Sequence, residues 1–127
     1  MLWTAILVLA PLLAEGPARP GLLEPEPVSI VALIATPEKY DGRLVRVIGF
    51  LHLEFEGNAI YVHEEDHKRH LAINGLWVDE NGACRSNRRN PDGHYALLEG
   101  VFNATRKGHT GLWSGAIEKI TRCERWE

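Results

Sequence analysis

The chain has 127 residues, of which 45% are hydrophobic, and this length leaves room for about one small domain. Its formal net charge is −3 at pH 7, whereas a dedicated nucleic-acid binder normally carries a basic surplus. We therefore expect one small domain and do not expect nucleic acid as its partner. A domain of this size often benefits from a covalent cross-link, because its core is modest.

The first segment of the chain is typical of an export signal. Residues 1–14 are almost wholly apolar and uncharged, and they are shorter than the roughly 20 apolar residues that span a bilayer. This pattern predicts a signal peptide that is cleaved after Ala14 or Ala18, with an uncleaved N-terminal anchor as the alternative. We expect a periplasmic or secreted protein without a stable membrane span after cleavage. The predicted organisation is a signal peptide at 1–18, a Pro/Gly-rich linker at 19–27 and a folded domain at 28–127.

A short helix is predicted at the start of this domain. Ser29 can cap a helix over residues 30–34, and Pro37 ends it because the residue before a proline is pushed out of the helical region. A strand over residues 28–35 is the competing interpretation, since Val and Ile favour extended chain. Residues 38–42 are then expected to form the turn into the first strand.

The sequence is dominated by a long strand at residues 43–55, followed by a turn and a second strand at 59–62. Apolar and polar residues alternate along the first strand, as they do in a strand with one buried face. Gly49 lies in the middle of the run, where a glycine usually marks a bulge or a sharp bend. The two runs therefore predict a long hairpin. The side chains predicted to be buried are those of Val45, Val47, Leu51, Leu53 and Phe55.

The remaining pattern completes a small barrel. Residues 63–70 are polar and predict one or two helical turns, and residues 79–93 predict an irregular loop. Three more strands are predicted at 76–78, 95–102 and 112–120, with a hairpin loop at 103–111. These elements predict a mainly β fold, a small five-stranded OB-like Greek-key barrel with a short N-terminal helix and a short helix after the first hairpin. Such barrels usually carry a helix between strands three and four, where this chain has its irregular loop.

Several segments resemble a group of small bacterial exported proteins with an OB-like barrel. These segments are Pro37–Gly42, Val45–Asn58, Ile60–Tyr61, Glu65–Asp66, Gly75–Val78 and Lys107–Gly115. The resemblance spans residues 28–122 and implies the barrel fold and a bacterial origin. It implies no activity, because the group has none that could be carried onto these positions. The histidine-rich segment, the arginine-rich loop and the two cysteines depart from the group.

The two cysteines are predicted to form a disulfide. An exported chain with Cys84, Cys123 and no other thiol is a natural candidate for one bridge. Strands three and five are parallel neighbours in an OB barrel, so their C-terminal ends lie at the same rim. Cys84 follows the third predicted strand by a few residues, and Cys123 follows the fifth almost directly. The alternative is a pair of free thiols.

A metal site is considered at the histidine-rich segment. His63, His67 and His70 are spaced by four and three residues, so on a helix their imidazoles would share one face. Such a face could hold Zn or Cu in an oxidising compartment. A short, solvated polar helix explains the same residues, and no cofactor is otherwise expected.

Two sets of residues are candidates for binding a partner. Arg85, Arg88 and Arg89 form a basic cluster in the irregular loop, for which a solvated loop is the alternative. Trp77 and Trp113 could form an aromatic platform of the kind on which OB barrels stack bases or sugars. In a small domain the same rings are also needed for the core.

No catalytic residues are predicted. The carboxylates show no fixed paired spacing, and the sequence contains neither a Gly-x-Ser-x-Gly motif nor a phosphate-cradling glycine loop. The leading hypothesis is an exported binding module that recognises a protein partner through its two polar loops, for instance to neutralise a toxin or an envelope enzyme. The alternative hypothesis is a barrel that binds a metal ion, an envelope glycan or an oligonucleotide.

Overall fold

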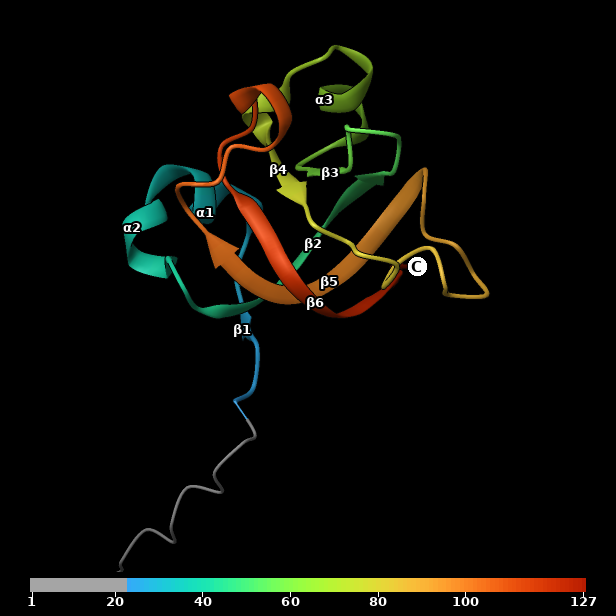
Figure 1. The fold of residues 1–127 in the computed structure, drawn as a ribbon, viewed down its shortest axis with the longest axis horizontal. Helices are drawn as coiled ribbons and strands as arrows, with labels where there is room; N and C mark the ends of the chain where they lie inside the picture. Colours follow the sequence, from blue (N-terminus) through green and yellow to red (C-terminus); the bar gives the residue numbers. More distant parts are fainter. Residues whose placement is uncertain (1–22) are drawn as a thin grey trace, which may run out of the picture.

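Five strands close into a barrel in the computed structural model, which describes residues 23–127 (Figure 1). The strands are β2 (Leu44–His52), β3 (Ala59–Tyr61), β4 (Gly75–Val78), β5 (His94–Asn103) and β6 (Ala116–Arg125). They follow one another around the barrel in the order β2-β3-β4-β6-β5, and β5 pairs with β2 to close it. The predicted five-stranded OB-like Greek-key barrel is thereby confirmed. The predicted signal peptide lies outside the described residues.

β2 is the strand at which the barrel closes, because it pairs with both β3 and β5. It pairs antiparallel with β5 along most of its length and with β3 at its C-terminal end. Gly49 stands where the two pairings meet: a Cβ atom there would lie 2.4 Å from the carbonyl oxygen of Tyr61 and 2.5 Å from a side-chain carbon of Ile30. The pairing register continues unbroken through Gly49, so the predicted bulge there is wrong. The glycine is needed for close packing of the backbones instead.

The irregularity of the barrel lies between β5 and β6. The register shifts between Glu99 and Val101 on β5. On the facing strand, Lys119 adopts a left-handed backbone conformation with φ 50°. This is the geometry of a β-bulge, which bends a strand and increases its twist. It lets the long β5–β6 hairpin curve around the core.

Burial along β2 follows the predicted alternation except at Phe50, which is buried although it lies on the opposite face from Val47 and Leu51. Val45, Val47, Leu51 and Leu53 are buried, as predicted. Phe55 is 90% exposed, so its predicted burial is wrong. The strand ends at His52, and Phe55 lies in the turn that follows, where alternation no longer determines which side a residue faces.

A sixth, short strand precedes the barrel. β1 (Glu26–Pro27) pairs in parallel with Val45 and Arg46 of β2. Glu26 and Pro27, which fall in the predicted linker, therefore belong to the sheet. Proline is tolerated here because β1 lies at the edge of the sheet, where one side needs no partner.

Short helices cover the barrel. α1 (Ile30–Ala35) begins at Ser29, whose hydroxyl oxygen accepts a hydrogen bond from the backbone N–H of Ala32 at 3.0 Å. The helix buries Ile30 and Leu33 against the core, which confirms the helix over the alternative strand. Pro37 ends α1 and also begins α2 (Pro37–Tyr40), in the stretch where a turn was predicted. Proline fits the first helical position because its fixed φ suits the helix.

The segments between the strands differ in regularity. α3 (Glu64–Lys68) follows β3 and confirms the helical turns predicted within residues 63–70. The 3-10 helix η1 (Ala72–Asn74), which was not predicted, comes next. The 79–93 loop is irregular, as predicted. The loop between β5 and β6 contains a second 3-10 helix, η2 (His109–Gly111). No helix within residues 23–127 is both long and apolar enough to cross a membrane.

The fifth barrel strand begins later than predicted. β6 starts at Ala116 and runs to Arg125, whereas the sequence indicated residues 112–120. Ser114 explains the difference, because its hydroxyl donates a hydrogen bond to the carbonyl oxygen of Ile73 at 2.6 Å, and its backbone N–H donates to Gly75. These bonds hold residues 112–115 against η1 and β4 rather than against β5.

The predicted disulfide is present. Cys84 and Cys123 are bonded, with their Cα atoms 5.1 Å apart, and both side chains are buried. The parallel pairing of β4 with β6 brings the two chain segments to one rim, as predicted. Cys123 itself lies inside β6, not after it. The bridge therefore ties the 79–93 loop directly to a barrel strand.

Candidate binding face

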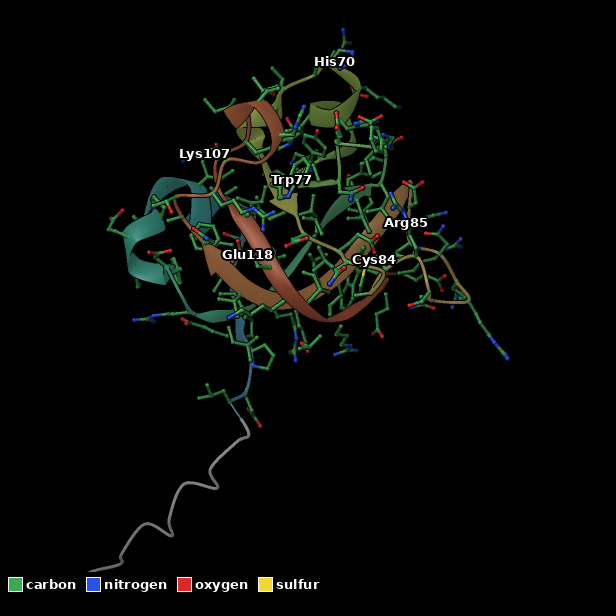
Figure 2. The ribbon with its side chains drawn as sticks, viewed as in Figure 1. His70, Trp77, Cys84, Arg85, Lys107 and Glu118 are labelled. Carbon is green, nitrogen blue, oxygen red and sulfur yellow. A yellow bond between two sulfur atoms is a disulfide. The ribbon has the colours of Figure 1, made fainter. Side chains whose placement is uncertain are left out.

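A cleft opens beside β4, between the β2–β3 loop (residues 53–58) and the β5–β6 loop (residues 104–115). Its volume is about 450 Å³, and its walls are formed by Glu56, Asn58, Trp77, Arg106, Gly108 and His109. OB barrels hold their ligands on this face, which is framed by the same two loops. Figure 2 shows Trp77 and Lys107 at this end of the barrel, with Glu118 below them on β6. We call this region the two-loop cleft.

Aromatic rings form the floor of the two-loop cleft. Trp77 and Trp113 meet edge to face, with ring centroids 5.2 Å apart. Gly108 lies directly on them: a Cβ atom there would be 2.6 Å from the Trp77 ring and 2.9 Å from the Trp113 ring. The structure therefore brings the two predicted tryptophans together, but only Trp77 lines the cleft. Trp113 is 9% exposed and supports it from below.

The charged groups of the two-loop cleft are paired with one another. Arg106 Nη1 lies 2.9 Å from Asp79 Oδ2 and 3.0 Å from Glu118 Oε1. Hydrogen bonds to these two carboxylates raise the pKa of Arg106 above its usual value. His109 Nε2 lies 3.3 Å from Glu56 Oε2 and connects the tips of the two loops. The cleft thus contains both signs of charge, and its guanidinium already has two anionic partners.

Three exposed apolar side chains lie on the segments next to this face. Phe55 in the β2–β3 loop is 90% exposed, Leu112 in the β5–β6 loop is 59% exposed, and Ile73 on η1 is 65% exposed. The Ser114–Ile73 hydrogen bond holds η1 against the β5–β6 loop, and the Glu56–His109 pair holds the two loop tips together. A set of large apolar side chains in one region marks a surface for interaction. We call Phe55, Ile73 and Leu112 the apolar rim.

Sequence reasoning missed the apolar rim. Phe55 was assigned to the buried face of a strand, and Leu112 to the start of the fifth strand. The Glu-Gly-Asn turn that follows Phe55 was a usable signal that the strand stops earlier. Ile73 gave no comparable signal, because an isoleucine at the end of the short apolar run Leu71–Ile73 is equally consistent with burial.

The three arginines of the 79–93 loop do not form one surface. Arg85 lies 3.4 Å from Glu80 and donates a hydrogen bond to Asn58 Oδ1 at 3.2 Å, so it braces the β2–β3 loop. Arg89 instead pairs with Glu127 at the C-terminus. Arg88 is exposed on the same loop. Figure 2 shows Arg85 close to Cys84, on the side of the loop nearest the barrel.

A buried carboxylate shapes the loop that carries Arg85. Glu80 is almost completely buried and accepts hydrogen bonds from the backbone N–H groups of Cys84 at 3.1 Å and Arg85 at 3.4 Å. Buried charge is tolerated only when it is paired and hydrogen-bonded in this way. Glu80 and the disulfide together hold the turn that aims Arg85 at Asn58. This loop therefore acts as a support for the two-loop cleft.

The three histidines proposed as metal ligands are not brought together. His63 is the N-terminal cap residue of α3, with its backbone N–H bonded to Asp66 at 2.9 Å. His67 packs inward against aromatic rings of the barrel. His70 lies beyond the helix in a left-handed conformation, with φ 57°. Within residues 23–127, no group of three or more His, Cys, Asp or Glu residues is arranged to hold a metal ion.

Comparison with known proteins adds no functional assignment: neither a family model nor a curated protein matches this chain. The OB barrel itself hosts many unrelated functions, so the fold does not select among them. A function for this protein has to be argued from its own cleft, rim and supporting loop.

Proposed function

We propose that this protein is an exported binding module that recognises a protein partner through the two-loop cleft and its apolar rim. The observation that carries the proposal is the exposure of Phe55, Ile73 and Leu112 around the face on which OB barrels hold ligands. Burial of apolar surface is the dominant favourable contribution to most protein–protein association, and a few residues carry most of the binding energy of an interface. A domain of this size gains nothing in stability from leaving a phenylalanine 90% exposed.

The charges around the cleft favour a protein over a nucleic acid. Phosphate recognition uses Lys and Arg side chains that neutralise the backbone. Arg106 is engaged by Asp79 and Glu118, and Arg85 is engaged by Glu80 and Asn58. The apolar rim likewise favours a protein, because a polar glycan would leave these side chains without complementary surface.

The disulfide supports the exported location within this proposal. Structural disulfides persist in the periplasm and outside the cell, and are rare in the reducing cytosol. The Cys84–Cys123 bridge is buried and holds the loop that braces Asn58. We therefore propose that the module works where this bridge is stable, against a partner such as a toxin or an envelope enzyme.

Site-specific crosslinking tests the proposed function. A photoreactive phenylalanine analogue at position 55 or 112 should capture a protein from periplasmic extract, to be identified by mass spectrometry. The same analogue at Val31, which is 56% exposed on α1, is the matched control and should capture none of that protein. In a parallel pull-down, Phe55→Ser and Leu112→Ser should lose the captured protein, and Val31→Ser should keep it. Equal capture at the rim and at Val31 would contradict the proposal.

A further inference from the structure

α3 contacts the barrel through one side chain in particular. None of its own residues is fully buried, so little apolar area holds it in place. His67 is the ring that points inward, with its centroid 5.9 Å from that of Phe50, 5.6 Å from that of Tyr61 and 3.9 Å from that of His52. The docking of α3 therefore depends on how His67 interacts with β2 and β3.

The contact between His67 and His52 is a parallel stack. The two imidazole planes are inclined by 27°, and His52 is the last residue of β2. Two carboxylates lie on the His52 side: Glu54 Oε2 is 3.1 Å from Nε2, and Asp92 Oδ1 is 3.9 Å from Nδ1. Within the described chain His67 has no ion pair of its own. Glu54 and Asp92 can stabilise one positive charge, on His52. They stabilise two positive charges, one on each ring, far less well.

The other ionisable groups around His67 do not replace such a partner. His70 follows α3 and adds a positive charge when it is protonated. Tyr61 faces the ring from β3, and burial raises the pKa of its hydroxyl, so it stays neutral in acid. η1 packs against α3 with Ala72, Ile73 and Asn74 and adds no ionisable group. From β5, the Tyr95 hydroxyl accepts a hydrogen bond from the backbone N–H of Glu64 at 3.3 Å. Glu54 and Asp92 lie against His52; their charges also raise the pKa of His67, but burial and the charge of His52 outweigh them.

We propose that the His52–His67 stack is a proton-sensitive latch, which holds α3 on the barrel while His67 is neutral and releases it when both rings are protonated. Two positive charges at the distance of this stack repel each other. Release of α3 would expose Phe50 and Tyr61, both of which are buried in the closed form. The latch stands independently of the proposed partner.

The direction of the response follows from proton uptake. Burial, followed by the charge of His52, lowers the pKa of His67 below its usual value. The His67 imidazole therefore binds a proton more readily when α3 is released than when α3 is docked. The docked form loses stability as the pH falls below the ordinary histidine range of about 6.5, and it is fully stable above that range.

Release of α3 would also alter the apolar rim, a consequence that rests on the proposed function. The backbone N–H of Leu71 bonds to the carbonyl oxygen of Asp66 at 2.8 Å, and Asn74 Nδ2 bonds to Asp66 Oδ1 at 3.0 Å. These bonds tie η1 to α3, and η1 presents Ile73. An acidic compartment would thus modify the partner-binding face through the latch.

Hydrogen exchange tests the latch without any partner. Exchange of the protein is measured at pH 7.5 and pH 5.0, after correction for the intrinsic effect of pH on exchange rates. Amides of residues 64–71 should lose protection, by up to roughly tenfold for each pH unit, which is the limit for uptake of one proton. Amides of β5 should keep theirs. Equal protection of residues 64–71 at both pH values would overturn the proposal.

Variants identify the rings responsible. His67→Phe retains an aromatic stack but cannot take up a proton, so its α3 amides should stay protected at pH 5.0. His94→Phe, at an exposed position on β5, is the matched control and should keep the full response. A pH response that persists in His67→Phe would overturn the latch.

An NMR titration of the unmodified protein covers the case in which His67→Phe does not fold. The signals of α3 and of the Phe50 and Tyr61 rings should change with the same midpoint as the His67 imidazole. Titration of His67 with those signals unchanged would refute the proposal.

Discussion

The two faces of β2 offer a direct test of register at the level of single residues. Leu51 is completely buried, while Ile48 on the same strand is 41% exposed. Leu51→Ala should therefore lower the free energy of unfolding by about 2–5 kcal/mol, because it leaves a cavity in the core. Ile48→Ala, the matched control, should cost no more than about 1 kcal/mol. Urea denaturation measures both, and equal losses would mean that Ile48 is as deeply buried as Leu51.

Substitution of two glycines compares a close contact with the backbone and a close contact with a side chain. At Gly49, an added Cβ atom would lie 2.4 Å from the backbone carbonyl oxygen of Tyr61. At Gly57 it would lie 2.4 Å from the carboxylate of Glu54, which is the far end of an exposed, flexible side chain. Gly49→Ala should therefore cost about 1–3 kcal/mol through overpacking, and Gly57→Ala should cost much less. Thermal melting of the two variants measures the difference; similar melting temperatures would show that β3 can shift away from residue 49.

The disulfide acts at the level of elements, because it links a loop to a strand. Cys84 and Cys123 are separated by 39 positions, and the chain-entropy estimate for a loop of this size is about 4 kcal/mol. Cys84→Ala combined with Cys123→Ala should lower the free energy of unfolding by up to that amount. Denaturation of the unmodified protein with reductant should show a comparable loss, and the double variant should not respond to reductant. Equal stability of the oxidised and reduced forms would contradict this role.

The elements that could be predicted are those specified by local patterns. The alternation of Val45, Val47 and Leu51, together with the turn residues between the strands, was sufficient for the barrel and for the disulfide across its rim. Alternation does not show where a strand stops, and for this reason Phe55 was misplaced. Residues 112–115 were misplaced because their hydrogen bonds go to η1 and β4, which are remote in sequence.

The candidate site was predictable only in part, for the same reason. Trp77 could be placed on the third barrel strand, next to the face that OB barrels use. The pairing of Arg106 with Asp79, and of His109 with Glu56, depends on how distant loops meet. The stack of His52 on His67 also depends on tertiary packing, whereas spacing alone grouped His67 with His63 and His70. Contacts of this kind leave no periodic signal in a sequence.

At the scale of the whole molecule, the remaining prediction concerns processing. The uncharged apolar run in residues 1–14 leads us to expect that intact mass spectrometry of the protein from its source will show the loss of the first 14 to 18 residues. Thiol labelling of the same sample after denaturation should detect no free cysteine. Recovery of the full-length chain from the cytosol, with two reactive thiols, would contradict both export and the proposed site of action.

The position of the Cys84–Cys123 bridge has a mechanical consequence. β5 and most of β6 lie between the two cysteines, so a pulling force applied to the chain ends passes through the bridge and bypasses that hairpin. The strands β2 to β4 would peel away under load while the bypassed hairpin carried no tension. With 39 positions shielded, the stretched molecule would be roughly 130 Å shorter than its reduced form at about 3.4 Å per residue. Single-molecule stretching with and without reductant would therefore read the oxidation state of one bond as a difference in length.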